Sequence, residues 1–214
     1  MTLWFTSDQH FRHDKIRLWC KRPFATIEEH DEALVRAWNG RVRAGDRVYV
    51  CGDFCWRGDP SPILERLNGE LYFLEGNHDG KPTLRHSRWR WVRGIAYVKH
   101  EGQSIMLSHY PMLTWRKREH GSWHLHGHSH NNLSHRVPYA KQRMDVGVDT
   151  RADFAPWSFE EIRAIMEQRQ RPLWRKLWDF LRLSHRKSAS TESCPTPTNQ
   201  DGACALDAET TPSR

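Results

Sequence analysis

The chain has 214 residues, of which 37% are hydrophobic and 28% are charged, and its large apolar side chains include 11 Trp. This composition supports one sizeable hydrophobic core more readily than two. No run of about 18 apolar residues occurs, which excludes a membrane-spanning helix, and the N-terminus lacks the basic and then apolar layout of a secretory signal. We therefore expect a cytoplasmic location.

Short runs of β-branched and aromatic residues predict buried strands. In chain order they span residues 3–6, 47–51, 70–74, 104–107 and 123–126. Residues 95–98 pair with 104–107 in a predicted hairpin, because a Gly-containing turn separates them.

Two capping boxes predict helices between and after these strands. Thr-Ile-Glu-Glu at 26–29 opens a helix to about residue 39, where Gly40 ends it, and Ser-Phe-Glu-Glu at 158–161 opens a helix to about residue 168. Strands that alternate with helices favour an α/β sandwich, with the folded unit over residues 1–170.

The C-terminal part of the chain has a different composition. Residues 171–188 hold six basic side chains and one acidic, within a formal net charge of +7 for the whole chain. Leucines at 173, 177 and 181 form a stripe, so this segment predicts a basic amphipathic helix. The helix either packs on the sandwich or recruits the protein to an anionic membrane or nucleic acid surface. Residues 189–214 lack apolar periodicity and predict a disordered tail.

Short polar clusters stand at the predicted strand ends and supply carboxylates, imidazoles and one amide. This mixture suits borderline divalent metals such as Mn²⁺, Fe²⁺ or Zn²⁺. Two ions about 3.5–4 Å apart need a bridging carboxylate and several further ligands each. The carboxylates, imidazoles and amide of these clusters are numerous enough to supply them. The clusters are Asp8-Gln9-His10, Gly52-Asp53, Gly76-Asn77-His78-Asp79, Ser108-His109 and Gly127-His128-Ser129-His130.

In their order and spacing these clusters resemble the calcineurin-like metallophosphoesterases, whose pattern runs D-x-H, GD, GNH followed by an acid, H, and GHxH. The resemblance spans about residues 3–150 and is greatest to the small single-domain bacterial and phage members. It implies a two-sheet β-sandwich flanked by helices in four layers. It also implies hydrolysis of phosphodiester or phosphomonoester bonds through attack of a hydroxide that bridges two metals.

The resemblance further assigns roles residue by residue. It implies a first metal held by Asp8, His10, Asp53 and His130, and a second held by Asp53, Asn77, His109 and His128. Mn²⁺ is the expected metal, with Fe, Zn, Ni or Mg as alternatives. His78 would donate a proton to the leaving oxygen or stabilise the phosphoryl oxygens, and Asp79 would orient His78.

Other positions near these motifs have two interpretations each. Arg57 lies where the Ser/Thr protein phosphatases of this superfamily carry a phosphate-binding Arg in GDxxDRG, although Trp56 replaces the acid; it binds a substrate phosphate or is a solvated loop residue. His13 either reaches the rim of the metal site or stays on the surface. Asp145 and Asp149 either support the metal ligands from behind or are satisfied strand-end carboxylates.

Five scattered cysteines, an odd number, are poor material for a disulfide framework, so we expect reduced thiols. Cys51 and Cys55 flank Asp53 and are expected to be buried structural residues, because the ligand set is complete without them. His124 and His126 lie on the same side of their strand as His128, but no motif supports them as ligands, and they are left out of the site.

Tryptophans raise the alternative of a nucleic acid substrate, since bases stack on exposed indoles. Trp4, Trp38 and Trp157 fall within or beside helix or strand patterns and are expected in the core. Trp56 and Trp115 lie in predicted loops, and three cations follow Trp115, so that loop either contacts substrate or is a solvated turn.

Three functions therefore remain under comparison: a di-metal phosphoesterase, a nuclease acting on DNA or RNA, and a non-catalytic binding protein on the same fold. The intact ligand set favours an enzyme. The sequence leaves the substrate and the oligomeric state open.

Overall fold

The computed structural model describes residues 1–133 and 141–170. The stretch Met1–Gln170 forms one compact unit. The amphipathic helix expected over 171–188 and the tail expected over 189–214 lie outside the described residues. No helix in the described part of the chain is long and apolar enough to cross a membrane.

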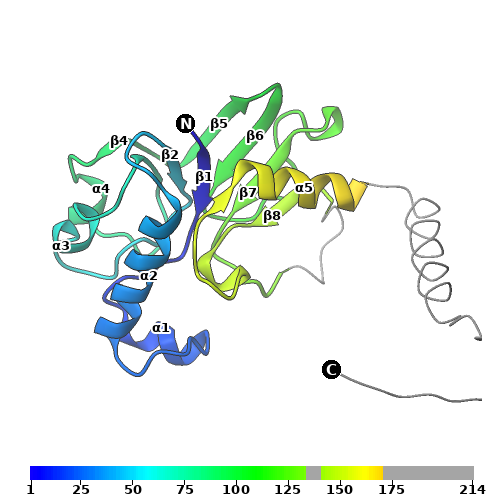
Figure 1. The fold of residues 1–214 in the computed structure, drawn as a ribbon. Helices are drawn as coiled ribbons and strands as arrows, with labels where there is room; N and C mark the ends of the chain where they lie inside the picture. Colours follow the sequence, from blue (N-terminus) through cyan, green and yellow to red (C-terminus); the bar gives the residue numbers. More distant parts are fainter. Residues whose placement is uncertain (134–140, 171–214) are drawn as a thin grey trace, which may run out of the picture. The chain divides into compact units, whose positions relative to one another are not determined.

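Two mixed β-sheets form the body of this unit (Figure 1). In the first sheet, four parallel strands follow the order β4-β3-β2-β1, and β9 is antiparallel to β1. Its strands are β1 (Leu3–Thr6), β2 (Arg47–Val50), β3 (Glu70–Leu74), β4 (Trp89–Arg93) and β9 (Trp157–Ser158). The second sheet has the order β5-β6-β7-β8 and comprises β5 (Ile95–His100), β6 (Gln103–Ser108), β7 (Trp123–His126) and β8 (Arg143–Asp145). This confirms the predicted α/β two-sheet architecture.

Helices flank the sheets. They are α1 (Asp14–Trp19), α2 (Ile27–Arg41), α3 (Ser61–Leu64), α4 (Lys81–Leu84) and α5 (Phe159–Gln170), with 3-10 turns η1 (Arg118–His120) and η2 (Val148–Thr150). Both predicted capping boxes are present at the starts of α2 and α5. The Glu29 N–H donates to Thr26 Oγ1 at 3.1 Å, and Ser158 and Glu161 cap each other. Helix α2 runs through Gly40, where the sequence predicted its end.

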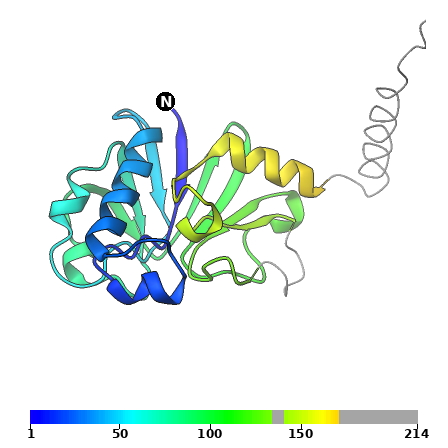
Figure 2. The same cartoon turned by 60° about the horizontal axis from the view of Figure 1, so that its bottom comes forward.

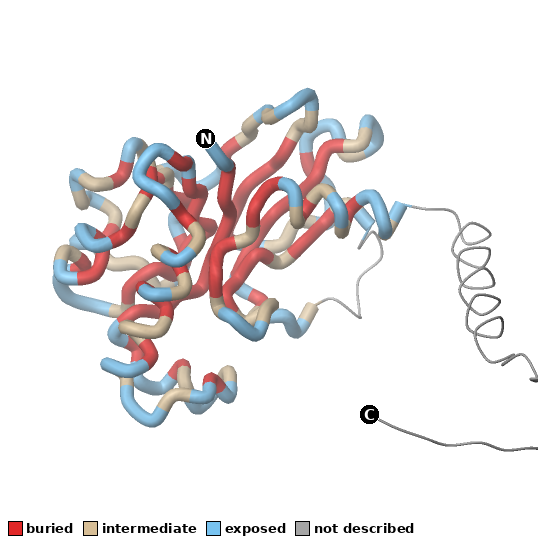
Figure 3. The backbone as a smooth tube through the Cα atoms, in the orientation of Figure 1, coloured by how far each residue is buried: buried red, intermediate tan, exposed pale blue. Residues whose placement is uncertain are grey.

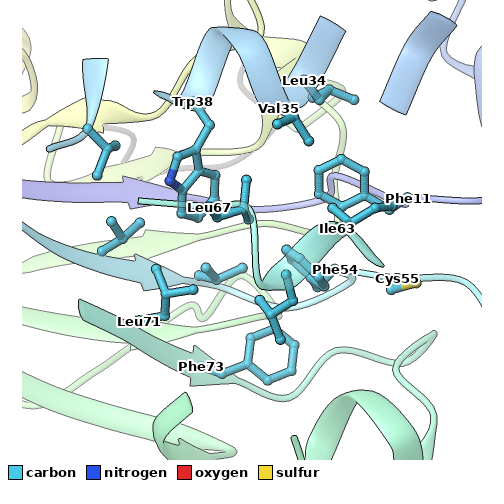
Figure 4. Packing of buried hydrophobic residues seen from close by; sticks show 14 of the residues in the cluster. Phe11, Leu34, Val35, Trp38, Phe54, Cys55, Ile63, Leu67, Leu71 and Phe73 are labelled. Carbon is cyan, nitrogen blue, oxygen red and sulfur yellow. The ribbon is translucent and has the colours of Figure 1, made fainter. Parts of the chain in front are cut away.

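The first sheet has an apolar layer on each face. Its strands β1, β2 and β3 are accordingly buried over most of their length (Figure 3). On its outer face Trp38 and Val35 of α2 pack against Phe73 and Leu71 of β3 (Figure 4). Trp38 is 2% exposed and is the largest fully buried side chain of the described unit. Successive residues of a strand point to opposite faces of the sheet, so the intervening side chains face the second sheet. Phe5 is one of them and belongs to the same apolar cluster as Ile105 of β6.

The outer face of the second sheet is covered by the connection over residues 110–122, which contains η1. Trp115 of this connection is 8% exposed and packs beside His124 of β7, with ring centroids 5.2 Å apart. The Met112 N–H donates to His124 Nε2 at 3.0 Å, and the Arg143 guanidinium donates to the Met112 carbonyl. The flanking layer on this face is therefore a fixed loop with a single 3-10 turn.

Candidate active site

The polar clusters meet at the carboxyl ends of the strands, at the edge that comes forward in Figure 2. Backbone hydrogen bonds join the loops that carry them. The Asp8 N–H donates to the Gly52 carbonyl at 3.1 Å, and the His10 N–H donates to the Asp53 carbonyl at 2.9 Å. In the second sheet, the Gly127 N–H donates to the His109 carbonyl at 3.0 Å. Parallel strands deliver their following residues to one edge, so residues distant in sequence share one site.

The structure brings together all seven residues expected to bind metal, in two groups. The ligand atoms of Asp8, His10 and His130 lie within 4.8 Å of one another, and so do those of Asp53, His109 and His128. Asp53 lies between the groups, because its Oδ2 is 3.4 Å from His10 Nε2 and 3.4 Å from His109 Nε2.

Asn77 completes the second group. Its side-chain Oδ1 lies 3.0 Å from His109 Nε2 and 3.1 Å from His128 Nδ1. The two groups correspond to the two ligand sets that the resemblance implies, with Asp53 in the bridging position.

The donor set fits divalent cations. His10 is 1% exposed, and its Nε2 has no hydrogen-bond partner in the described part of the chain. A buried imidazole nitrogen without a partner costs free energy, and a cation that accepts its lone pair removes this cost. Imidazole nitrogens and carboxylate oxygens are also the ligands preferred by Mn²⁺, Fe²⁺ and Zn²⁺.

The backbone of the site is held in a conformation that non-glycine residues rarely adopt. Five of the seven expected ligands have positive φ angles: Asp8 (59°), His10 (52°), Asp53 (53°), His128 (67°) and His130 (44°). Such conformations persist only where the surrounding structure enforces them, and they gather at functional sites. Here the sharp turns after the strands aim the side chains at a common centre.

Burial acts differently on the two central carboxylates. Burial raises the pKa of the fully buried Asp8 carboxyl to about 7. Burial opposes ionisation of Asp53 as well, but its hydrogen bond to His109 and the nearby charges of His109 and His10 outweigh it and lower the pKa of Asp53 to about 2. Cations bound beside both groups would favour the charged form of each.

Asp149 and Asp145 support the ligands from behind, which is one of the two interpretations of these residues. Asp149 Oδ2 lies 2.7 Å from His130 Nδ1, and its carboxylate accepts two hydrogen bonds from the Arg22 guanidinium at 2.8 and 2.7 Å. Asp145 accepts hydrogen bonds from Ser129 Oγ, the Asn131 N–H and the Gly147 N–H. The loop that carries His128 and His130 is thereby fixed from both sides.

Asp79 has contacts other than those expected of it. Its carboxylate accepts hydrogen bonds from the backbone N–H groups of Gly76, Asp53 and Phe54, at 2.8–2.9 Å. Across the described residues, no hydrogen bond joins Asp79 to His78. The expectation that Asp79 orients His78 is therefore corrected: Asp79 fixes the turn that presents Asp53, because three converging N–H groups occupy its oxygens.

His78 and His13 form an aromatic group with Trp56 beside the expected metal ligand His10. The His78 ring is half-buried, 5.3 Å from the His10 ring and 5.1 Å from the Trp56 ring. His13 is 3% exposed and stacks on Trp56 at 4.1 Å, with Nδ1 3.4 Å from His10 Nδ1. His13 therefore lies behind His10 and under Trp56, not at the surface.

Arg57 and Trp115, two candidate substrate contacts, differ in their exposure to solvent. Arg57 is exposed, and its guanidinium lies 5.0 Å from the Trp56 ring. Trp115 is buried, and its indole N–H donates to the Ser122 carbonyl. The expectation that the Trp115 indole stacks on a substrate is thus wrong, because this indole packs on the outer face of the second sheet.

The cysteines beside Asp53 are structural, as expected. Cys51 and Cys55 are free thiols with exposures of 0% and 2%. Burial raises the pKa of both thiols.

Sequence reasoning missed three residues of this region. Arg22 is 4% exposed and donates to the carbonyls of Asp8 and Gln9 as well as to Asp149. Cys20 Sγ lies 3.4 Å from His130 Nδ1, and Trp19 is 66% exposed at the end of α1. No motif or periodic pattern marks these positions. They reach the site only because the chain from His10 folds back over it as α1.

Comparisons with known proteins agree with this site. A family model described as calcineurin-like phosphoesterase matches residues 1–132. An uncharacterized protein of Methanocaldococcus jannaschii is 30% identical in an alignment of 172 residues that covers 78% of this chain and 92% of that protein. The gene 66 protein of Mycobacterium phage L5 is 25% identical over 179 residues, covering 68% of this chain and 86% of the phage protein.

One solved structure shares the fold at low sequence identity. A protein of unknown function from Aquifex aeolicus has a TM-score of 0.63 and 23% identity, covering 77% of this chain and 98% of that one. The family model covers more than half of the chain, and its span contains all seven residues of the two ligand groups. The chain belongs to the calcineurin-like phosphoesterase family.

Proposed function

We propose that this protein hydrolyses phosphodiester or phosphomonoester bonds with the help of two divalent cations, Mn²⁺ first among them. The observation that carries the proposal is the position of Asp53, whose Oδ2 is 3.4 Å from an imidazole nitrogen of each ligand group. A carboxylate between two groups of three or more ligands is the arrangement a two-metal site requires. Family membership supports phosphoester chemistry.

Asp8, His10, Asp53 and His130 would hold one cation, and Asp53, Asn77, His109 and His128 the other. Such a pair supplies Lewis-acid stabilisation of the phosphoryl oxygens and lowers the pKa of a water molecule in the site. The chain contributes the geometry: Asp149 orients His130, and the Cys51 carbonyl lies 2.9 Å from His109 Nδ1, which leaves His109 Nε2 directed at Asp53.

His78 is suited to proton transfer at the leaving oxygen. Its backbone N–H donates to Asp53 Oδ1 at 2.9 Å, so its position is fixed relative to the bridging carboxylate. Within the described residues its ring nitrogens make no hydrogen bond, which leaves them available to a substrate oxygen. Arg57 would bind a phosphoryl oxygen, a role supported by its exposed guanidinium, which makes no ion pair in the described part of the chain.

The test is turnover of bis-p-nitrophenyl phosphate and p-nitrophenyl phosphate by purified protein loaded with Mn²⁺. We expect hydrolysis of at least one ester. His78→Ala should lower kcat by about 10²–10⁴-fold, because one proton transfer in the transition state loses its donor, while Mn²⁺ binding is kept.

A matched control uses another exposed histidine of the same unit. His120→Ala in η1 removes an imidazole remote from the ligand groups and should leave both kcat and KM unchanged. Absence of turnover of both esters by protein shown to contain two Mn²⁺ would contradict the proposal. So would an equal loss of rate in the His120 and His78 variants.

A further inference from the structure

An open pocket of about 490 Å³ adjoins the proposed metal centre. His130 belongs to both. Its Nε2 lies 3.9 Å from Asp8 Oδ1 in the first ligand group, and its Nδ1 side meets Asp149 and Cys20, which line the pocket. The volume is within the range of small-molecule sites. A phosphate ester held at the cations therefore has space for one of its alcohol groups beyond His130.

The pocket offers an aromatic surface. Trp19 lines it and is 66% exposed, an unusual position for the largest apolar side chain. The Trp19 and His13 rings make a T-shaped contact, with centroids 5.4 Å apart and ring planes at 88°, while two thirds of the Trp19 side chain stays accessible to solvent. Phe154 also lines the pocket. An accessible indole face beside a phosphoester site is suited to stacking on a planar ring.

Polar groups with free hydrogen-bonding capacity surround this aromatic surface. Asn131 and Asn132 line the pocket, and their backbone N–H groups are fixed by Asp145 and the Ser129 carbonyl. Their side-chain amides make no hydrogen bond in residues 1–133 and 141–170. Each amide offers a donor pair and an acceptor, which matches the edge of a nucleobase.

The charge of the pocket favours an anionic ligand. Lys21 lines it and makes no ion pair with any described residue, whereas Arg22 is neutralised by Asp149. Lys21, His130, Asn131 and Phe154 all have positive φ angles, so the surrounding structure holds these walls in place. The pocket is thus preformed, aromatic on one side, amide-lined on another and positive at its edge.

We propose that this pocket binds the nucleoside part of a nucleoside phosphate ester whose phosphorus lies at the metal centre. Stacking on Trp19 and hydrogen bonds from Asn131 and Asn132 would select a nucleobase over a simple alkyl or sugar group. This inference rests on the proposed phosphoesterase function and names its substrate class.

The experiment compares two diesters that share the leaving group: the p-nitrophenyl ester of thymidine 5′-monophosphate and methyl p-nitrophenyl phosphate, each with Mn²⁺-loaded protein. We expect kcat/KM to be at least about ten-fold higher for the thymidine ester. Trp19→Ala should reduce this ratio by roughly 5- to 150-fold, the range found for loss of one stacked base. Trp19→Phe, which keeps an aromatic face, should restore most of the ratio.

The matched control is Leu18→Ala. Leu18 is 70% exposed on the same helix and does not line the pocket, so the ratio should not change. A wild-type protein without preference for the thymidine ester, or a ratio that is equal in wild type and Trp19→Ala, would overturn the inference.

A binding measurement separates failure of this inference from failure of the proposed function. Calorimetric titration of the Mn²⁺-loaded protein with thymidine 5′-monophosphate and with inorganic phosphate requires no turnover. We expect the nucleotide to bind about ten-fold tighter than phosphate, and Trp19→Ala or Asn131→Ala to abolish the difference. Equal affinities of the wild-type protein for the nucleotide and for phosphate would refute nucleoside binding in the pocket, whether or not esters are hydrolysed. Nucleotide selectivity in a protein that hydrolyses neither these diesters nor p-nitrophenyl phosphate would support nucleoside binding in the pocket and contradict the phosphoesterase.

Discussion

The carboxylate of Asp149 links a proposed metal ligand to a buried cation. It contacts His130 Nδ1 at 2.7 Å and the Arg22 guanidinium at 2.7 Å, and the Arg22 side chain is fully buried. Removal of one partner of a buried pair leaves an uncompensated charge, at a cost of about 3–5 kcal/mol. Loss of the group that orients a ligand imidazole lowers metal affinity by about 10–100-fold.

We therefore predict that Asp149→Asn lowers both the free energy of unfolding and the affinity for Mn²⁺. The control is Glu32→Gln, which breaks a half-exposed pair with Arg66. That change should have a much smaller effect on stability, because exposed pairs contribute about 0–1 kcal/mol, and none on Mn²⁺ affinity. Denaturant unfolding and Mn²⁺ titration measure both quantities. Equal effects of the two substitutions would contradict the role given to Asp149.

His124 makes folding sensitive to acid. It is completely buried, its Nε2 accepts the Met112 N–H, and its Nδ1 lies 3.3 Å from the Met106 carbonyl. Burial lowers the pKa of His124 to about 3, whereas an unfolded chain protonates the same imidazole near pH 6.5. Since the unfolded state binds the proton first, stability present above pH 6.5 is lost as pH falls from about 6.5 toward 3, by up to about 1.4 kcal/mol per pH unit.

His124→Gln removes this titration and keeps a side chain that can accept the Met112 N–H. We predict that the free energy of unfolding of the metal-free variant declines less steeply than that of the metal-free wild type between pH 6 and pH 4.5. Denaturant unfolding at a series of pH values gives both slopes. Parallel slopes would show that His124 does not carry this sensitivity.

At the scale of elements, the site depends on the close approach of strand ends. Gly127 follows β7, and a Cβ atom added there would collide with the Ser7 hydroxyl and the Asp8 carboxylate after β1. Gly40 lies inside α2, where an added Cβ would meet nothing within 4 Å. The two glycines therefore respond differently to the same added methyl group.

Gly127→Ala should destabilise the protein by more than about 1 kcal/mol and weaken Mn²⁺ binding, because β7 and β1 must separate. Gly40→Ala should stabilise it by about 0.5–1 kcal/mol, through the lower entropy of the unfolded chain and the higher helix propensity of Ala. Thermal unfolding measures the stability of the two variants, and Mn²⁺ titration measures their metal affinity. A stable Gly127→Ala protein with full metal affinity would contradict the described packing of the strand ends.

The elements that could be predicted from the sequence are those with a local signal. The capping boxes marked α2 and α5, and β-branched runs marked β1, β2, β3, β6 and β7. α1 was missed because its N-cap, His13, makes no side-chain hydrogen bond, and α3 and α4 are only four residues long. β4 reads Trp-Arg-Trp-Val-Arg, and its cationic residues concealed a strand at the edge of the sheet.

For the molecule as a whole, the proposed metal ligands could be predicted from the sequence, whereas the residues of α1 and after it that surround them could not. The seven ligands lie in short motifs directly after strands, so their sequence order carries the information. Arg22, Cys20 and Trp19 reach the same centre through tertiary folding alone, from the end of α1 and the residues that follow it. Trp115 shows the converse: a Trp followed by cations resembles a substrate loop, yet its indole covers a sheet face.

Metal removal should act on the whole described unit, because ligands from both sheets would share the cations. Any species that binds only the folded state stabilises it by mass action, about 2.7 kcal/mol at a concentration 100 times its Kd. We predict that EDTA lowers the Tm of the Mn²⁺-loaded protein by several degrees and that added Mn²⁺ restores it. Differential scanning calorimetry measures this shift. An unchanged Tm would contradict a cation-binding site between the two sheets.

The central claim is that Asp53 bridges two cations, and metal content per chain tests it most directly. Protein equilibrated with Mn²⁺, freed of excess metal and analysed by inductively coupled plasma mass spectrometry should contain two Mn²⁺ per chain. Asp53→Asn should contain one or none, since an amide cannot supply the charge that both cations share. Wild-type protein that holds at most one Mn²⁺ per chain, or an Asp53→Asn variant that keeps two, would contradict the account.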